Sequence, residues 1–257
     1  MELKSVKAKK SLGQNFLADS SILAAIASAV VHDPHETIIE IGPGHGELTR
    51  ELLKVATRVI AIEKDRELIP VLTKEFAPLI REGRFTLIEG DALEELPKLA
   101  RGTYSIAGNI PYYLTGHLLR IVGELNQKPR VSVFTLQREV ARRAAAKPPH
   151  MNLLAATVQV WADISILRTI PRTAFRPVPK VDSAVIQLIT KVAPVPEAYY
   201  RTAKMLFAHP RKTIFNNLRE VPNASEKLAS LGLNPNARPQ TLGIEDIERL
   251  TAAIEVY

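Results

Sequence analysis

The sequence contains no cysteine, few aromatic residues and no long hydrophobic run. Without cysteine, the chain cannot form disulfides, use a thiolate nucleophile or bind zinc through sulfur ligands. The longest apolar candidate, residues 22–31, is interrupted by Ser28, whereas a membrane helix needs about 20 apolar residues. Residues 1–10 are basic but lead into Ser-Leu-Gly-Gln-Asn, so we expect no signal peptide. These absences predict a soluble, cytoplasmic protein.

The composition is otherwise that of a folded globular protein. Of the 257 residues, 46% are hydrophobic and 24% are charged, a balance that excludes disorder as the dominant state. At about 150 residues per domain, this length allows one large domain or two unequal ones.

The positive charge is unevenly distributed. The chain has a net charge of +7, yet residues 1–10, 128–150 and 168–180 together carry +12 and the remainder carries −5. Basic stretches on an otherwise acidic chain are typical of polyanion-binding proteins, because each neutralised phosphate releases counterions. A solvated surface face is the alternative explanation for any one stretch. Three such stretches together favour nucleic acid as a partner.

Short β-branched runs alternate with helical patterns through most of the chain. The runs predicted as strands are residues 37–41, 59–63, 85–89, 104–108, 131–137, 158–170 and 183–190. Helices are predicted at 48–55, after 63 and at 138–146; Asp65 is expected to cap the second of these and Pro70 to lie in its first turns. The alternation predicts an α/β fold, with a mostly parallel, doubly wound sheet, helices on both faces and an antiparallel final portion.

The composition changes after residue 190. Residues 193–196, Ala-Pro-Val-Pro, resemble a linker, and the patterns from Glu197 onward are helical, with loops at three prolines. We therefore predict a sheet domain over 1–191 and a small helical domain over 192–257.

The sharpest local feature is Glu-Ile-Gly-Pro-Gly-His-Gly at residues 40–46, between a predicted strand and a predicted helix. Gly42 and Gly44 would let the backbone turn tightly and approach a ligand closely. Glu63 ends the next strand, where a carboxylate can bind both ribose hydroxyls of an adenosine cofactor. A purely structural glycine turn is the alternative.

Two further motifs follow the next strands. After the third strand, Asp91 can accept a hydrogen bond from an adenine amine, and Ala92 would leave room for the ring; Asp91 could equally be a helix N-cap. The fourth strand ends in Asn109-Ile-Pro-Tyr. The Asn109 oxygen and the backbone carbonyl before or at Pro111 can accept bonds from an exocyclic amine and aim its lone pair at a methyl group. Tyr112 offers a face for an unstacked base. A simple turn leaving a strand is the alternative here.

These motifs together resemble those of the ribosomal RNA adenine dimethyltransferases. The resemblance rests on residues 11–17 (Ser-Leu-Gly-Gln-Asn-Phe-Leu), 40–46, 63, 90–92 and 109–112, and continues through 136–140, 175–183, 211–218 and 238–242. It implies a Rossmann-like methyltransferase fold and S-adenosyl-L-methionine as cofactor. The implied substrate is a pair of adjacent adenosines in the hairpin near the 3′ end of small-subunit (16S) rRNA, each dimethylated on N6 during ribosome biogenesis.

The resemblance also implies roles for individual residues. Gln14, Asn15 and Leu17 would close over the methionine end of the cofactor, which would rest on Gly42 and Gly44. Glu63 would hold its ribose, and Asp91 and Ala92 its adenine. Asn109, which also belongs to the cofactor-binding set, would hold the target N6 with Pro111, between the rings of Tyr112 and Phe175. A purely structural core position is the alternative for Phe175.

RNA contacts are expected from the basic residues Lys7, Lys9, Lys10, Arg142, Arg143, Arg176, Arg211 and Lys212. The chain departs from the family pattern at 147–154 and 208–210, which would affect RNA docking more than methyl chemistry. His32, His35 and His45 have no carboxylates at ligand spacing, so no metal is expected. Trp161 is expected in the core.

The implied reaction is a direct in-line transfer, with the N6 lone pair attacking the sulfonium methyl and no general base evident. The implied partner is small-subunit rRNA in an immature particle, bound by a monomer. Two alternatives stay open: a large-subunit rRNA adenine methyltransferase of the resistance type, and a non-catalytic RNA-binding assembly or transcription factor on the same scaffold.

Overall fold

The computed structural model describes residues 9, 13–31, 33 and 35–255. Lys7, Lys10, Ser11 and His32, named above, lie outside the described residues. The chain divides into two compact units, one comprising residues up to 141 together with 165–190, the other comprising 142–164 and 191–257. The second unit thus takes in residues 142–164 as well as the tail. The division into domains at 191/192 stays a prediction.

A seven-stranded sheet organises the first unit. Its order is β4 (Phe85–Glu89), β3 (Arg58–Glu63), β2 (Thr37–Ile41), β5 (Tyr104–Asn109), β6 (Val131–Gln137), β9 (Ser183–Thr190) and β7 (Ala162–Ile170). The five strands from β4 to β6 are parallel, and β9 pairs with β6 antiparallel. A separate two-stranded pair joins β1 (Phe16–Leu17) to β8 (Phe175–Arg176). The predicted α/β class and the antiparallel final portion are confirmed.

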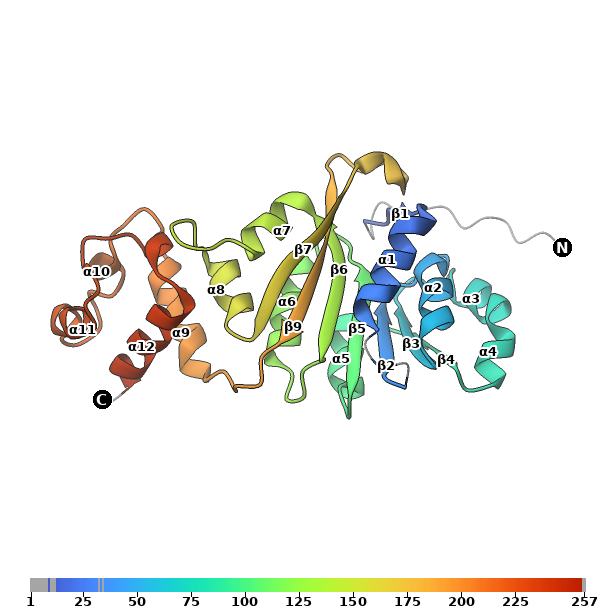
Figure 1. Ribbon diagram of the computed structural model, residues 1–257, viewed down its shortest axis with the longest axis horizontal. Helices are drawn as coiled ribbons and strands as arrows, with labels where there is room; N and C mark the ends of the chain where they lie inside the picture. Colours follow the sequence, from blue (N-terminus) through green and yellow to red (C-terminus); the bar gives the residue numbers. More distant parts are fainter. Residues whose placement is uncertain (1–8, 10–12, 32, 34, 256–257) are drawn as a thin grey trace. The chain divides into compact units, whose positions relative to one another are not determined.

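Helices cover both faces of this sheet (Figure 1), with α1 and α2 in front and α5 and α6 behind. The helices of this part are α1 (Ser20–Val30), α2 (Glu47–Val55), α3 (Ile69–Glu75), α4 (Ala77–Arg81), α5 (Ala92–Leu99), α6 (Thr115–Glu124) and α7 (Arg138–Ala144). Ile26 and Leu52 are fully buried examples of the apolar faces that these helices turn to the strands. Burial of such faces is the main source of helical stability in a fold of this kind.

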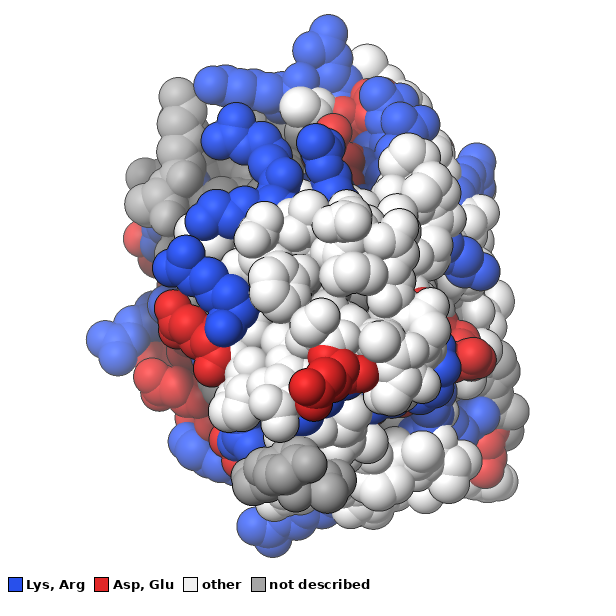
Figure 2. Space-filling model, turned by 90° about the vertical axis from the view of Figure 1, so that its left-hand side faces the viewer, with Lys and Arg blue, Asp and Glu red and all other residues white. Residues whose placement is uncertain are grey.

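The second unit is helical apart from the start of β7. It contains α8 (Leu153–Gln159), α9 (Glu197–Phe207), α10 (Ile214–Asn217), α11 (Ala224–Ser230) and α12 (Ile244–Glu255). Figure 2 shows the face on the left-hand side of Figure 1, where Lys and Arg side chains gather toward the top and most acidic side chains lie lower. No helix among the described residues is long and apolar enough to cross a membrane.

Two local predictions were wrong. The strand predicted over 158–170 begins only at Ala162, because Asn152 accepts the Ala155 N–H (3.1 Å) and starts helix α8, which overrides the β-branched pair Thr157-Val158. Trp161 lies in the turn between α8 and β7 and is buried as expected. Asp65 does not cap α3: its carboxylate accepts the Glu67 N–H within a turn.

A buried ion pair ties the amino ends of three parallel strands. Glu36, just before β2, has a fully buried side chain that pairs with Arg130 and also accepts the Ser105 hydroxyl of β5 (2.9 Å). Arg130 directly precedes β6. The ionised glutamate therefore depends on Arg130 for compensation of its lost hydration.

We expect Arg130→Met to lower the free energy of unfolding by about 2 kcal/mol, because it leaves the buried Glu36 carboxylate without a cationic partner. Urea denaturation measures this change. The matched control is Arg120→Met on α6, whose exposed arginine lies 3.9 Å from Glu124 and should cost less than about 0.5 kcal/mol. Equal losses in the two variants would contradict the proposed importance of the Glu36 pair.

Candidate active site

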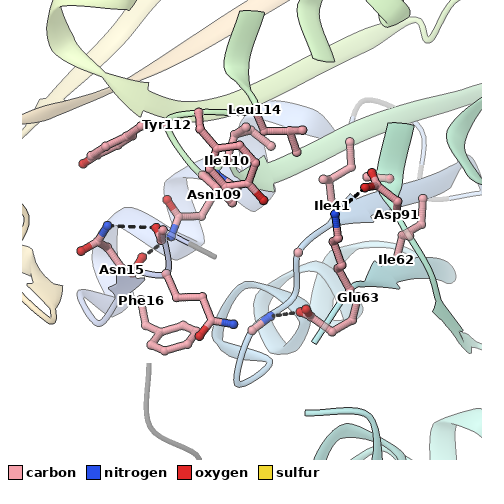
Figure 3. Close-up of a pocket in the computed structure, with 18 of the residues that line it drawn as sticks. Asn15, Phe16, Ile41, Ile62, Glu63, Asp91, Asn109, Ile110, Tyr112 and Leu114 are labelled. Carbon is pink, nitrogen blue, oxygen red and sulfur yellow. Dashed lines mark hydrogen bonds and ion pairs between the residues drawn. The ribbon is translucent and has the colours of Figure 1, made fainter. Parts of the chain in front are cut away.

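A pocket opens at the carboxyl ends of the parallel strands (Figure 3). It has a volume of about 820 Å³ including its open mouth and the solvent in it. The lining residues come from five stretches of the first unit: 13–16, 41–44, 62–64, 90–92 and 109–114, with Phe175 added from β8. The ligand site of an open α/β sheet lies at this edge.

The glycine run forms one wall of the pocket. Gly44 has a positive φ of 62°, and a Cβ there would lie 2.8 Å from the Phe16 ring, so only glycine fits. The Gly44 N–H donates to Glu63 Oε2 (3.1 Å), and the Asp65 N–H donates to Oε1 (2.8 Å). Burial raises the pKa of Glu63, which these two backbone donors oppose. The carboxylate is thus fixed in orientation, with lone pairs left for ligand hydroxyls.

Asp91 serves as a helix cap and also lines the pocket. Its Oδ1 accepts the Leu93 N–H (2.9 Å) and caps α5, while Oδ2 accepts from Lys64 Nζ (2.7 Å). Burial alone would raise the pKa of Asp91, but Lys64 and Leu93 lower it below its usual value. The N-cap alternative is therefore correct, and it leaves Asp91 ionised on the pocket wall as an acceptor.

Asn109 has a defined amide orientation. Its Nδ2 donates to the Asn15 carbonyl (2.7 Å), and only the amide nitrogen can make this bond. Oδ1 therefore faces away as an acceptor, and no donor among the described residues bonds to it. Nearby, the Tyr112 hydroxyl lies 3.0 Å from Ser183 Oγ, which anchors its ring to β9. Figure 3 shows both side chains at the same end of the pocket.

The pair of β1 and β8 brings Phe16 and Phe175 to the pocket. Phe175 is 1% exposed and packs in the core cluster while also lining the pocket, so the core position and the pocket position are compatible. Leu17 pairs with Phe175, and its side chain is buried in the same cluster, not on the pocket wall. Side chains alternate along a strand, so Phe16 faces the pocket and Leu17 does not. The part of Leu17 in holding the cofactor stays a prediction.

The other predicted site residues come together around one pocket. Gln14, Asn15, Gly42, Gly44, Glu63, Asp91, Ala92, Asn109, Pro111, Tyr112 and Phe175 all line the pocket. The sequence analysis missed Phe16, Lys64 and Tyr113, which also line it. Phe16 lies within the 11–17 motif quoted above. Its ring packs against the ring of His45, with the centroids 4.4 Å apart, and His45 therefore has a packing role. The described residues contain no group of three or more His, Asp or Glu side chains placed to hold a metal ion.

The basic residues expected to bind RNA fall into two groups. Lys9 is paired with carboxylates, and the Arg176 guanidinium donates to the carbonyls of Thr173 and Phe175. By contrast, four residues of the second unit are exposed and form no ion pair within the described part of the chain: Arg142, Arg143, Arg211 and Lys212. These four are available to a polyanion.

Comparison with known proteins decides the family. A sequence model described as "Ribosomal RNA adenine dimethylase" matches residues 5–255. This chain belongs to the ribosomal RNA adenine dimethylase family. A curated relative from Dehalococcoides mccartyi, named "Ribosomal RNA small subunit methyltransferase A", is 36% identical over 263 aligned residues, covering 97% of this chain and 89% of the relative.

Solved structures agree on the fold of this dimethylase-family chain. A dimethyladenosine transferase from Plasmodium falciparum superposes with a TM-score of 0.77 at 24% identity, covering 91% of this chain and 95% of that one. The 23S rRNA methyltransferase ErmE gives a TM-score of 0.73 at 24% identity, covering 94% and 100%. At these identities the likeness concerns the fold alone, and it confirms the expected Rossmann-like methyltransferase fold.

Glu40, directly before the glycine run of this family member, is a buried carboxyl group with no cationic partner among the described residues. The residue is 1% exposed; Thr49 Oγ1 donates to its Oε2 (2.6 Å), and no described residue bonds to Oε1. Burial raises the pKa of Glu40 to about 8. The folded protein therefore holds a proton here at neutral pH that the unfolded chain releases near its ordinary pKa of 4.5.

This bound proton gives a pH-dependent stability. Between pH 5 and 8 the folded state binds more protons than the unfolded state at Glu40, so the contribution of this group to stability falls as pH rises, by up to about 1.4 kcal/mol per pH unit. Glu40→Gln removes that dependence. We expect the difference in unfolding free energy between the Glu40→Gln protein and the wild type to shift in favour of the variant from pH 5 to pH 8, as measured by urea denaturation. A difference that does not vary with pH would contradict a neutral Glu40.

Proposed function

We propose that this chain transfers methyl groups from S-adenosyl-L-methionine to N6 of two adjacent adenosines in the 3′-terminal hairpin of small-subunit (16S) rRNA. The observation that carries the proposal is the amide of Asn109. Its nitrogen donates to the Asn15 carbonyl, and its oxygen is left as an acceptor in a pocket that Tyr112 also lines.

The pocket has the features that the cofactor requires. Glu63 presents a fixed carboxylate for ribose hydroxyls, and Asp91 an ionised one for the adenine amine. Ile62 and Ala92 belong to the same lining and would give a flat ring an apolar surface. S-adenosyl-L-methionine supplies an already electrophilic methyl group, so the protein has to orient and desolvate the reactants more than activate them.

Asn109 and Pro111 would then hold the target amine. The Asn109 oxygen and the backbone carbonyl before or at Pro111 would accept from the N6 hydrogens, which leaves the nitrogen lone pair pointing along the line of transfer. Tyr112 and Phe175 would stack on the two faces of the flipped base. Since no carboxylate or imidazole is needed beside the nucleophile, the excess proton of the product leaves to solvent.

Surface charge and the names of the relatives support an rRNA partner. The exposed arginines and lysine of the second unit suit an RNA backbone, and the curated relatives are named as small-subunit methyltransferases. We propose an immature small ribosomal subunit in the cytoplasm as the target and a monomer as the acting form. Light scattering after gel filtration should give the mass of one chain.

The decisive test is transfer of labelled methyl from S-adenosyl-L-methionine to small subunits that lack these methylations, followed by nucleoside digestion. We expect N6,N6-dimethyladenosine, and we expect Asn109→Ala to reduce the rate by about 100-fold through lost positioning. Asn126→Ala, at an exposed asparagine after α6, is the matched control and should retain the wild-type rate.

Other substrates define the contrary outcomes. Labelling of large subunits but not small ones would favour the resistance-type reaction. Cofactor binding with no label in either subunit would favour a binding factor that has lost catalysis.

A further inference from the structure

The carboxylate of Asp65, two residues after Glu63, accepts three hydrogen bonds. Its side chain is fully buried. Oδ1 accepts from Lys9 Nζ (2.6 Å) and from the Glu67 N–H (3.1 Å), and Oδ2 accepts from Gln14 Nε2 (3.0 Å). Its own N–H donates to Glu63. Asp65 thus connects the proposed ribose acid to the segment that contains Gln14.

Lys9 completes this connection from the other side. Its Nζ also lies 3.0 Å from Glu67 Oε1, and its backbone N–H donates to Gln14 Oε1 (2.7 Å). Both ends of the Gln14 amide are therefore fixed, the oxygen by Lys9 and the nitrogen by Asp65. An ammonium held between two carboxylates is not free to contact a phosphate, contrary to the RNA contact predicted for Lys9.

The same segment is held at its far end by the proposed target site. The Asn15 carbonyl accepts from Asn109, Phe16 pairs with Arg176, and the Ala18 N–H donates to the Ala174 carbonyl (3.0 Å). Gln14 and Asn15 line the pocket between these two attachments. Residues 13–18 therefore form a strap along the pocket, and Asp65 with Lys9 forms its charged attachment.

The stability of this attachment depends on the charges of Asp65 and Lys9. Burial alone would raise the pKa of Asp65, but hydrogen bonds from Lys9 and Gln14 outweigh it and keep the pKa below its usual value. A buried carboxylate that loses one of its charged partners becomes costly. The strap would then be released more easily, and cofactor binding would have to supply the free energy of ordering it again.

We propose that Asp65 and Lys9 are positioning residues for cofactor binding, which act by holding Gln14 against the pocket. The proposal rests on the proposed function, because it assigns the pocket to S-adenosyl-L-methionine. It concerns the cofactor alone, so the affinity for RNA and the rate with saturating cofactor should not depend on the pair.

The test compares Lys9→Met, Lys9→Arg and Lys54→Met. Calorimetry with S-adenosylhomocysteine, the stable product, measures affinity without turnover. We expect Lys9→Met to raise the Kd about tenfold and the KM for S-adenosyl-L-methionine equally, with kcat and the KM for RNA unchanged. Lys9→Arg should recover most of the affinity, because a guanidinium can bridge both carboxylates. Lys54→Met removes a surface lysine paired with Glu51 and should bind like wild type.

A second variant tests the mechanism of the effect. Asp65→Asn should weaken binding at least as much as Lys9→Met, and the double variant should bind no worse than Asp65→Asn alone, because the two residues form one interaction. Thermal melting establishes that each variant is folded; Lys9→Met, at a partly exposed side chain, decides the question if Asp65→Asn does not fold.

The outcomes separate the two proposals. If wild-type protein does not bind S-adenosylhomocysteine, the proposed function fails. If wild type binds and Lys9→Met binds equally well, the positioning role is overturned while the function stands. A raised KM for RNA with an unchanged cofactor Kd would also overturn it, since Lys9 would then contact RNA. The positioning role would also be overturned if the losses of cofactor affinity caused by Lys9→Met and Asp65→Asn were additive in the double variant.

Discussion

The parallel register of β2 to β5 is the constraint on which the site depends. Ile41 pairs with both Ile62 and Gly108, and Glu63 pairs with Glu89, so these strands end within one or two residues of each other. Side chains far apart in the sequence thereby emerge at one edge of the sheet, on a backbone held by ladder hydrogen bonds. The register of the sheet therefore fixes the positions of the residues at the strand ends, and most of the pocket is built from these residues.

The buried acidic groups of the first unit are stabilised in different ways. Glu36 has an arginine, Glu40 keeps its proton, Glu63 accepts two backbone N–H groups, and Asp65 binds a lysine. Of these four, the Glu63 carboxylate alone faces the pocket, and no described cation pairs with it. That arrangement preserves its acceptor capacity for a ligand, whereas the others contribute to local stability and to the placement of loops.

The sequence was sufficient for features that depend on local periodicity and on strand ends. Strands 37–41, 85–89 and 131–137 have the predicted boundaries, because buried parallel strands read as continuous apolar runs. The convergence of Glu63, Asp91 and Asn109 followed from the same topology. Helix α8 was missed because one N-cap at Asn152 outweighed β-branched neighbours. The Lys9 and Lys64 ion pairs were beyond prediction, since a lysine in a sequence carries no sign of its distant partner.

The small pair of β1 and β8 joins residues about 160 positions apart in the sequence. Such a contact closes a very long loop, and the entropic cost of closure precedes any stabilisation that the contact provides. On the ribosome, the strands that carry Glu63, Asp91 and Asn109 emerge well before residue 175. A nascent chain would therefore build the cofactor edge of the sheet first and acquire Phe175, with the anchored strap, only when the last third of the chain is being made. The pocket is thus complete only after nearly the whole first unit has been synthesised.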